Sequence, residues 1–491
     1  MQGETPLGRL QKVPGHIKIL SLRSDFCLAD GPPMLLNHPE MSFDSLGEKT
    51  ATLWRIAGSK ILALQKAYES KGATPVFTVG GLYQPQGWTE WTQGFQFGCQ
   101  ILQFDATGDE NFLEIGRRNT LERMAPHLTH FGVHDHGFNN VSTYGNLRRL
   151  MLEGRISRDE RELQLYELAL KVSGAVQAVR WSETSDGDGY IYSFNGPHSL
   201  FCDTIRSLRS LAIAHRLGQR LLDENDEAIS LLDRLLEHAR STARYNVYYG
   251  EGRDYYDTPG RVAHESIFNV NDGTFRCPST QQGYSPFTTW TRGLAWILTG
   301  YAEQLEFLAI CSDAELVEAG GRGENEQAMR RAAIAAAEFY IENTPTDGIP
   351  YWDTGAPGLV HLGDYLSRPA EVDNPHEPVD SSAAAIAAQG FLRLGNYLQR
   401  DEPKRSARYI DAGLTILHRL LEPPYLSHDS NHQGLLLHAL YHRPRGWDHI
   451  PEGKAVPQGE SCLWGDYHLM EVALLADRLN KGEIYPTFFG G

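Results

Sequence analysis

The sequence predicts an all-α protein in which twelve helices form the six hairpins of an (α/α)6 barrel. From Phe43 onward, apolar residues recur at three- and four-residue steps in almost every segment, which is the spacing of an amphipathic helix. The even-numbered helices carry glycine in or near their first turns. Because such a glycine costs about 1 kcal/mol against alanine, its repetition indicates close helix packing. The odd-numbered helices have a charged side, as expected of an outer layer.

The spacing of the helical hairpins favours a closed ring. Hairpins that repeat about every 50 to 90 residues fit six pairs in a barrel, whereas a linear helical solenoid, the alternative, has shorter and more regular repeats. No linker rich in Pro, Gly or Ser divides the chain, so residues 43–491 are expected to form one catalytic barrel domain. Residues 1–42, with prolines at positions 32, 33 and 39, are expected to form an irregular N-terminal extension.

Each of the first six helices is placed by its apolar repeat and by a turn or capping residue before it. In order, they are predicted at 43–70, from about Trp91, after an Asp109 cap, around 144–151, after a capping box of Ser157 with Glu160, and from about Asp203.

The last six helices follow the same logic. They are predicted after a turn at 223–226, from about Trp290, over roughly 324–343, after Asp380, near 406–421, and from about Ser461 to Leu479.

Composition and charge limit the function classes. The chain has 491 residues, of which 41% are hydrophobic and 22% charged, and this is typical of a globular protein with a large core. The formal net charge of -17 argues against nucleic acid and anionic membrane surfaces as partners. The first residues lack a signal-peptide pattern and no apolar stretch approaches the ~20 residues of a spanning helix, so a cytoplasmic protein is expected. The six cysteines form no CxxC pair, which disfavours both a metal site and a disulfide framework.

The most unusual stretch, residues 281–296, combines a turn with the start of the eighth helix. A glycine and a Ser-Pro pair give turn chemistry, and the helix that follows opens with Trp290, Arg292 and Trp296. Together with Gln282, these side chains place aromatic faces beside planar hydrogen-bonding groups. That combination suits a sugar ring, which has apolar faces and a polar rim. A large helix that begins with aromatic residues for packing alone is the plainer interpretation.

Other polar and aromatic residues fall at the starts of the remaining even-numbered helices. They are Trp91 with Phe95, the segment 134–138, Asp203, Asp380 and the segment 465–467. In a barrel of parallel inner helices, these starts converge on one mouth, where helix N-termini present free N–H groups and partial positive charge. Such a mouth suits the carboxylate of a uronic acid, even in an acidic protein.

Asp203 and Asp135 are the predicted catalytic pair. Asp203 follows Phe201 and Cys202, a setting apolar enough to raise its pKa and keep a proton for donation; a helix cap is the simpler alternative. Asp135 lies between two histidines, and its charge near Asp203 would help to keep one carboxyl protonated. The two flanking histidines lack a third ligand at metal-binding spacing, so no metal is expected. His264 is a candidate polar contact or a structural residue.

The motifs at these helix starts resemble, in order, those of the unsaturated glucuronyl hydrolases, a glycoside hydrolase family, and the likeness extends from about residue 91 to 479. The matching segments are Trp91-Thr-Gln-Gly-Phe95, Thr107-Gly-Asp-Glu110, His134-Asp135-x-Gly137-Phe138, Asp203, His264, Gln282-Gly-Tyr-Ser285, Trp290-x-Arg292-Gly-x-Ala-Trp296, Pro350-Tyr-Trp-Asp353, Asp380-Ser-Ser-Ala-Ala-Ala-Ile386 and Leu463-Trp-Gly-Asp466-Tyr467. Each motif alone is weakly specific, whereas their shared order is strongly specific.

The resemblance implies a hydrolase that acts on short oligosaccharides left by polysaccharide lyases, which carry a 4,5-unsaturated uronic acid at the non-reducing end. It implies that Asp203 protonates C4 of the double bond while water adds at C5, that Asp135 positions the ring, and that no cofactor takes part. A small anionic oligosaccharide is then the expected partner. The expected substrate-binding residues are His264, Gln282 and Arg292 around the uronate and water, with Trp91, Phe95, Trp290 and Trp296 as pocket walls.

The sequence departs from this family pattern in three places. After Asp203 it reads Thr-Ile-Arg-Ser-Leu208, where relatives are expected to have a methionine-asparagine run. The loop 355–378 is longer than usual, and we expect it to reshape the leaving-group side. The segment 443–458 lacks the basic-and-serine pattern that binds sulfate in some members, although Lys454 is present. The identity of the substrate therefore stays open.

Three other functions remain as alternatives. One is an unsaturated rhamnogalacturonyl hydrolase on the same barrel, which differs in the lyase product that it accepts. Another is an α/α-barrel sugar epimerase or isomerase, in which histidines act as acid and base, so that His264 matters more than Asp203. The last is a sugar-binding or scaffold protein without turnover.

Overall fold

The computed structural model describes residues 34, 41–87, 90–483 and 487–490. These residues belong to one compact unit. The predicted N-terminal extension, residues 1–42, lies almost wholly outside the described residues. Among the helices that are described, none combines the length and the apolar character needed to cross a membrane.

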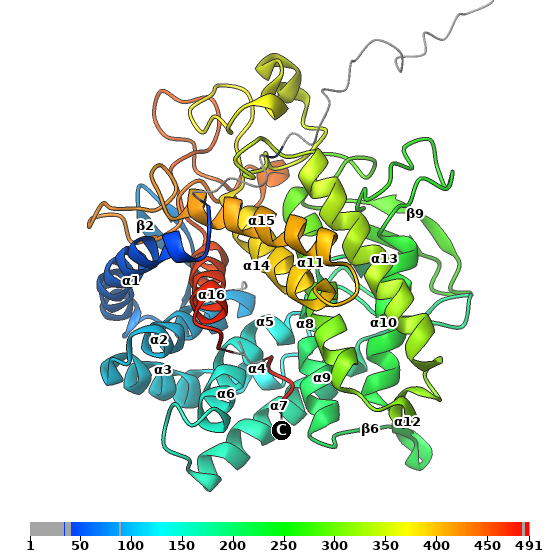
Figure 1. The fold of residues 1–491 in the computed structure, drawn as a ribbon. Coiled ribbons are helices and arrows are strands. Elements are labelled where there is room, and N and C mark those ends of the chain that lie inside the picture. Colours follow the sequence, from blue (N-terminus) through cyan, green and yellow to red (C-terminus); the bar gives the residue numbers. More distant parts are fainter. Residues whose placement is uncertain (1–33, 35–40, 88–89, 484–486, 491) are drawn as a thin grey trace, which may run out of the picture. The chain divides into compact units, whose positions relative to one another are not determined.

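Six inner helical segments form a closed ring (Figure 1). They are α2 (Gln93–Thr107), α5 with α6 (His136–Asn140 and Asn146–Leu152), α8 with α9 (Thr204–Ser207 and Arg209–Arg216), α11 (Thr291–Ile310), α14 (Ser381–Leu398) and α16 (Leu463–Asn480). A π-helical turn, η3 (Val141–Gly145), joins α5 to α6. Consecutive segments pack on one another in chain order, and α16 closes the ring by packing on α2.

Six outer helices cover this ring, and Figure 1 shows most of them around its periphery. They are α1 (Gly47–Tyr68), α3 (Glu110–Arg123), α7 (Glu160–Val179), α10 (Leu231–Tyr245), α13 (Gly321–Glu342) and α15 (Pro403–Leu420). Each outer helix packs against an inner one. The alternation of inner and outer helices confirms the predicted six-hairpin α/α barrel.

The remaining helical segments are short connectors. They are α4 (Ala125–Leu128), α12 (Asp313–Leu316), η1 (Asp44–Leu46), η2 (Glu90–Thr92), η4 (Glu224–Asp226), η5 (Pro357–Leu362), η6 (Tyr365–Ser367) and η7 (Arg443–Arg445).

Helix starts agree with the predicted caps in all but one of the cases compared. The Asp109 carboxylate accepts a hydrogen bond from the Asn111 amide at the start of α3. The predicted capping box of Ser157 with Glu160 is wrong. Asp159 caps α7 instead, accepting from the amides of Arg161 and Glu162, because the residue directly before the first helical turn is the one whose side chain reaches those amides.

Glycine marks the places where neighbouring inner helices touch. A Cβ atom at Gly94 of α2 would overlap the backbone of Asn139 in α5, and one at Gly137 of α5 would overlap the carbonyl of Ser207 in α8. A Cβ atom at Gly390 of α14 would lie 2.7 Å from the Thr299 hydroxyl of α11. These contacts are the packing reason predicted for glycine in the inner helices, at the starts of α2 and α5 and deeper in α14.

Short strands occur in the loops between helices, and these strands were not predicted from the sequence. The hairpins are β1 (Thr74–Val79) with β2 (Leu82–Gln86), β3 (Trp181–Glu183) with β4 (Gly189–Ile191), and β6 (Leu221–Leu222) with β7 (Ala228–Ile229). A three-stranded antiparallel sheet runs in the order β5 (Ser199–Phe201), β8 (Glu265–Phe268), β9 (Phe275–Ser279). Strands of two to six residues carry too little alternation to be recognised by periodicity.

The three-stranded sheet brings segments that are distant in sequence to one edge. Phe201 pairs with Glu265, which pairs with Ser279. Asp203 follows the first of these residues, His264 precedes the second, and Gln281 follows the third. The sheet register therefore places all three at the same end of the sheet, beside the start of α8.

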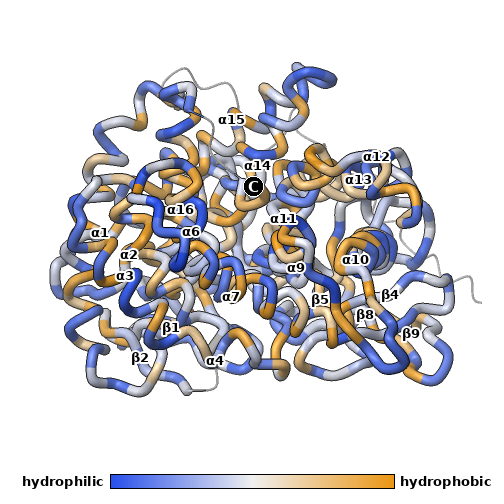
Figure 2. Tube along the Cα trace, turned by 90° about the horizontal axis from the view of Figure 1, so that it is seen from below, coloured by the Kyte–Doolittle hydropathy of each residue, from blue (hydrophilic) through white to orange (hydrophobic). Residues whose placement is uncertain are grey.

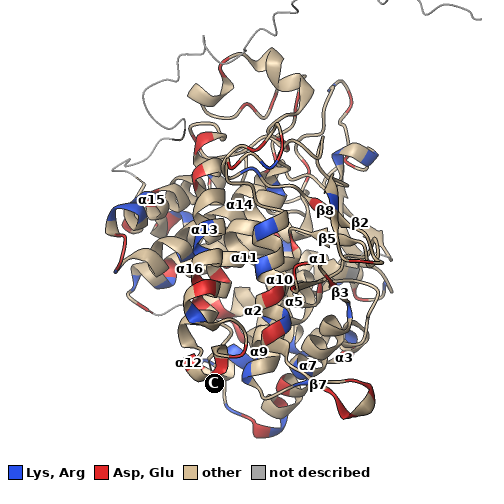
Figure 3. Cartoon of the chain, turned by 90° about the vertical axis from the view of Figure 1, so that its right-hand side faces the viewer, with Lys and Arg blue, Asp and Glu red and all other residues tan. Residues whose placement is uncertain are grey.

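The apolar core is one cluster with side chains from all twelve hairpin helices. In Figure 2, hydrophobic residues lie along the helices, whereas hydrophilic residues concentrate in the outer loops. A smaller cluster lies behind the three-stranded sheet. Figure 3 adds that charged residues also occur on the inner helices, including α11 and α16.

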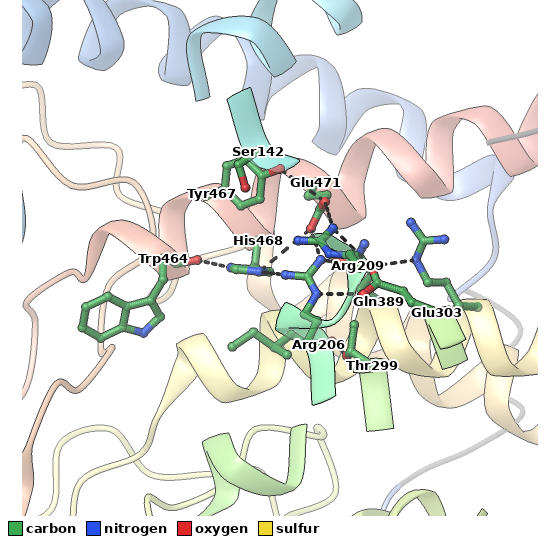
Figure 4. Close-up of polar contacts among 12 residues, drawn as sticks. Ser142, Arg206, Arg209, Thr299, Glu303, Gln389, Trp464, Tyr467, His468 and Glu471 are labelled. Atoms are coloured by element: carbon green, nitrogen blue, oxygen red, sulfur yellow. Dashed lines mark hydrogen bonds and ion pairs between the residues drawn. The ribbon is translucent and has the colours of Figure 1, made fainter. Parts of the chain in front are cut away.

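Some of these inner charges form a buried ionic network inside the ring (Figure 4). Arg206 lies 2.8 Å from Glu471 and 3.2 Å from Glu303, and Arg209 lies 3.4 Å from Glu303. All four side chains are at most 2% exposed. The Arg206 guanidinium also lies 5.6 Å from the ring centroid of Trp296. We call these four charged residues the axial ion network.

Candidate active site

A cavity of about 410 Å³ lies where the inner helices begin. Both predicted catalytic aspartates, Asp135 and Asp203, line it. So do most of the predicted substrate-binding residues, namely Trp91, Gln282, Trp290, Arg292 and Trp296. The starts of α2, α5, α8 and α11 thus converge on one mouth, as the barrel model predicted.

The two aspartates lie on either side of one histidine. His134 Nε2 lies 3.3 Å from Oδ1 of Asp203, a hydrogen-bonding distance, and 3.8 Å from Oδ1 of Asp135. All three residues are less than 9% exposed. Neither aspartate side chain caps the described helix that follows it, so the helix-cap alternative for Asp203 is wrong. From the sequence, His134 was weighed only as a metal ligand, and its place beside both carboxylates was not predicted.

Burial and neighbouring charges shift the three groups in different directions. Burial raises the pKa of Asp135, and the nearby charge of Asp203 adds to this rise. Burial opposes the charged form of His134, but the two aspartates outweigh it and raise the His134 pKa. Burial alone would raise the pKa of Asp203, yet the hydrogen bond and charge of His134, together with His264 and Arg292, lower it.

The expected rise in the pKa of Asp203 is therefore wrong for the ligand-free protein. The reason is that the apolar neighbours Phe201 and Cys202 are not its whole surroundings. Cationic and hydrogen-bonding groups from other elements favour its carboxylate form. The proton of this group of residues resides more readily on His134 or Asp135.

Arg292 is fully engaged by groups of the protein. Its guanidinium lies 3.1 Å from Asp380, donates to Gln282 Oε1 at 2.8 Å and to the Tyr441 carbonyl at 2.8 Å, and also contacts the Leu440 carbonyl. It is 2% exposed. Arg292 thus fixes the Gln282 amide and the 440–441 backbone at the cavity wall, besides contributing positive charge.

His264 supports the cavity from behind and does not line it. Its Nδ1 accepts hydrogen bonds from the amides of Gln281 at 3.0 Å and Gln282 at 3.4 Å. Its ring packs 4.4 Å from Phe201 and 4.8 Å from Trp290. Burial lowers its pKa to about 4. A neutral ring that accepts from backbone amides is a support for the turn that carries Gln282.

Phe95 also lies behind the cavity wall, which corrects the prediction that it forms part of the wall. It is fully buried and packs 5.8 Å from Trp91 and 6.2 Å from Phe138. Both of those rings line the cavity. Phe95 lies one helical turn beyond Trp91, so its side chain points deeper into the barrel.

A loop before α16 supplies part of the cavity wall that was not predicted from the sequence. Tyr441, His442, Arg445 and Trp447 line the cavity, and the His442 ring lies 4.9 Å from that of Trp447. Among the described atoms, neither ring nitrogen of His442 has a hydrogen-bond partner. No motif marks these residues, because the loop is held in place by the distant Arg292, which donates to the Leu440 and Tyr441 carbonyls, and by its own Asp448 carboxylate, which accepts from two of its amides.

The predicted departures affect the site only indirectly. None of the residues 355–378 lines the cavity, so the expected reshaping of the leaving-group side by that loop is not observed. The neighbouring Asp353 instead accepts from the Tyr284 amide at 2.8 Å and so holds the 281–290 turn. In the run that follows Asp203, Arg206 points to the axial ion network. Lys454 pairs with Asp373 at 2.7 Å.

No group of three or more His, Cys, Asp or Glu side chains within the described ranges has an arrangement that could hold a metal ion.

Comparisons with known proteins agree with this fold and site. No protein-family model matches the chain. The unsaturated glucuronyl hydrolase of Bacillus sp. (strain GL1) is 26% identical over 407 residues, which cover 81% of this chain and 89% of that protein. The unsaturated chondroitin disaccharide hydrolase of Streptococcus agalactiae serotype III (strain NEM316) is 22% identical and covers 81% and 84%.

Solved structures share the same fold. The unsaturated glucuronyl hydrolase from Streptococcus agalactiae superposes with a TM-score of 0.65 at 20% identity, covering 92% of this chain and 98% of that one. The Bacillus sp. GL1 enzyme gives a TM-score of 0.61 at 24% identity, covering 89% and 99%.

The chain has the all-α barrel fold of these solved hydrolases and is similar over most of its length to the two curated hydrolases. Its particular likeness is to the unsaturated glucuronyl hydrolases, and the resemblance predicted from the motifs is confirmed.

Proposed function

We propose that the protein releases a 4,5-unsaturated uronic acid from the non-reducing end of short oligosaccharides produced by polysaccharide lyases. The observation that carries this proposal is the pairing of Asp135 and Asp203 around His134 in a cavity walled by aromatic rings. Rings suit the apolar faces of a sugar, and the volume of about 410 Å³ suits a short oligosaccharide. The names of the similar proteins add support for an unsaturated uronate as substrate.

In the proposed reaction, Asp203 acts as the acid and the base. Its carboxyl proton goes to C4 of the double bond, and water attacks the electron-poor C5 that results. The Asp203 carboxylate then takes a proton from that water, so its protonation state is restored. The hemiketal formed at C5 opens and expels the remaining sugar. The chemistry avoids attack at the anomeric carbon, unlike that of ordinary glycosidases.

The other cavity residues orient the substrate in this proposal. Asp135 positions the uronate ring through its hydroxyls. Gln282, whose amide oxygen is held by Arg292, presents its amide at a fixed angle. Trp91, Trp290 and Trp296 form apolar walls for the sugar faces. The positive charges of Arg292 and Arg445 at the cavity favour an anionic sugar despite the net charge of the protein.

The test is a screen of unsaturated disaccharides made by lyases from glycosaminoglycans and from pectin. Turnover is followed by loss of the absorbance of the conjugated double bond and by release of the second sugar. Glycosaminoglycan products are expected to be consumed, and Asp203→Asn protein is the inactive control. Turnover of pectin products alone would favour an unsaturated rhamnogalacturonyl hydrolase. If no substrate loses its double-bond absorbance and none releases its second sugar, the proposal is contradicted.

A further inference from the structure

His134 is held rigidly between the two carboxylates. Its carbonyl oxygen accepts hydrogen bonds from Gln177 Nε2 at 2.8 Å and from the Ser207 hydroxyl at 2.6 Å. Its ring lies 5.5 Å, edge to face, from Phe201 and 6.1 Å from Phe194. These contacts come from α7, from α8, from β5 and from the loop before β5, so the imidazole has little freedom to turn away from Asp203.

The charges that face this imidazole come from beside or within five elements. The charged or titratable groups around it are Asp135 before α5, Arg180 after α7, Asp203 before α8, His238 on α10 and His264 before β8. The Arg180 guanidinium is bound to backbone carbonyls, with the Tyr192 oxygen at 3.0 Å and the Ser193 oxygen at 2.6 Å. The two carboxylates are therefore the groups closest to the His134 ring nitrogen, and they favour a proton on it.

This arrangement presents a difficulty for the proposed reaction. Protonation of C4 requires Asp203 to carry a proton when the double bond arrives. In the ligand-free protein, the Asp203 carboxyl favours its charged form and His134 favours its charged form. A hydrogen-bonded ion pair of this kind is stable while water has access to the cavity.

We propose that His134 stores the proton that Asp203 delivers, and passes it from Nε2 to Oδ1 of Asp203 when substrate fills the cavity and excludes water. This inference rests on the proposed function and assigns the source of its proton. His134 is a positioning residue in this account, because it acts through Asp203.

The proton and charge balance of this step is complete. The Nε2–H bond breaks and its electron pair stays on the imidazole, while an O–H bond forms on Asp203. An ion pair becomes a neutral imidazole beside a neutral carboxylic acid. Loss of water favours this direction, because burying two charges costs more than burying two neutral groups. After turnover Asp203 has taken a proton from the attacking water, and the return of solvent restores the ion pair.

The first test measures the titration of His134 without substrate. NMR of the full-length protein with labelled histidine gives the His134 pKa in the wild-type protein and in Asp203→Asn protein. In the wild type, the His134 pKa is expected to lie above its ordinary value. In the variant it is expected to be lower by about one unit or more, because a carboxylate beside the ring has been removed. The same His134 titration in both proteins would overturn the inference.

The second test uses the pH dependence of kcat/KM. In the wild type, kcat/KM is expected to fall at alkaline pH, when the proton shared by His134 and Asp203 is lost. In His134→Gln protein, Asp203 must hold its own proton, so this alkaline limb is expected to move to lower pH by about one unit or more. An unchanged limb in folded His134→Gln protein would overturn the inference.

His136→Gln is the matched control for these kinetics. His136 is two residues away and buried, but it bonds Ser173 and the His130 carbonyl and does not line the cavity. Its substitution should leave the alkaline limb in place; an equal shift would show a general structural effect and overturn the inference. If the wild-type protein consumes no unsaturated disaccharide, the proposed function fails, while the His134 titration still decides whether the proton is shared with Asp203.

Discussion

Nη1 of Arg292 lies 3.1 Å from Oδ2 of Asp380, and both side chains are at most 3% exposed. The pair joins the start of α11 to the start of α14, because the other Asp380 oxygen accepts from the Ser382 amide at 3.0 Å and caps α14. The same guanidinium holds Gln282. One buried ion pair thus connects two inner helices to a side chain of the cavity.

Arg292→Ala protein is expected to bind charged substrate more weakly, with a KM raised about tenfold or more, because a hydrogen bond to a charged group contributes about 1.5–3 kcal/mol. It is also expected to lose about 3–5 kcal/mol of unfolding free energy, since Asp380 is left unpaired. Steady-state kinetics and denaturant unfolding measure the two effects. Arg292→Lys is the control for charge alone: if lysine restores KM, the fork of hydrogen bonds to Gln282 and Asp380 is unimportant.

Asp203→Asn protein is expected to be folded but inactive, because an amide cannot donate a proton to C4. The loss of kcat should be at least about a thousandfold, near the upper part of the range for general acid–base catalysis. Turnover assays with circular dichroism spectra check both parts. Substantial residual activity would contradict the role given to Asp203.

Gly137→Ala protein is expected to be strongly destabilised. A Cβ atom there would overlap the Ser207 carbonyl, which is backbone and cannot move aside without shifting α8. We expect a loss of about 1–3 kcal/mol or more in unfolding free energy. Gly323→Ala in α13 is the matched control, because nothing lies within 4 Å of its Cβ position. The control should be neutral or slightly stabilising, and equal losses at both positions would refute the close-approach explanation.

Removal of Arg206 from the axial ion network is expected to cost about 3–5 kcal/mol, because Arg206→Ala removes the cation closest to Glu303 and Glu471 and leaves them the more distant Arg209, at 3.4 and 3.8 Å. Arg158→Ala provides the comparison, since Arg158 pairs with Glu160 at the surface with 57% exposure. That change should have little effect on stability, because exposed ion pairs contribute little. Chemical denaturation of both variants measures the difference, and a small effect at Arg206 would show that the network can relax.

Thermal stability is expected to fall as the pH is lowered from about 6.5 to 4. Burial lowers the pKa to about 4 for five histidines, namely His127, His136, His264, His438 and His442. In this window the unfolded chain binds more protons than the folded one, so stability rises with pH. Burial raises the pKa of Asp353 and Asp448 to about 6 and that of Glu237 and Glu306 to about 7. These four carboxyls act in the opposite direction between their unfolded and folded pKa values.

Melting curves between pH 4 and 7.5 measure this balance. Burial also lowers the pKa of His238 to about 3, so six histidines against four carboxyls should leave a net decline of Tm toward acid. His127→Gln protein, which can keep the hydrogen bond to Gln93, should show a slope reduced by about one proton. A melting temperature that is flat or rises toward pH 4 would contradict the assignment of neutral buried histidines.

The sequence predicted the helices well because helix periodicity and caps are local signals. All twelve hairpin helices occur where apolar repeats indicated them, and Asp109 and Asp380 cap α3 and α14. The Ser157 cap failed because the choice between Ser157 and Asp159 depends on where the first helical turn begins. The short strands were missed because their pairing partners are distant in the chain.

The site was predicted in composition more accurately than in geometry. Helix starts brought Asp135 and Asp203 to one cavity, as expected. The side of the wall on which Phe95 and His264 lie depends on side-chain direction, which spacing alone does not define. The pKa of Asp203 depends on a histidine that lies 69 positions away in sequence, so neighbours in the chain were a poor guide to its charge state.

Closure of the ring by α16 against α2 affects how the chain folds during synthesis. Helix α2 leaves the ribosome early, yet its lateral partner is the final helix of the twelve. Until residues 463–480 emerge, the nascent barrel has an open seam with apolar flanks, and contacts of long sequence separation form late. Newly made chains therefore have a period of exposure to aggregation and chaperone binding that ends only after residues 463–480 have been made.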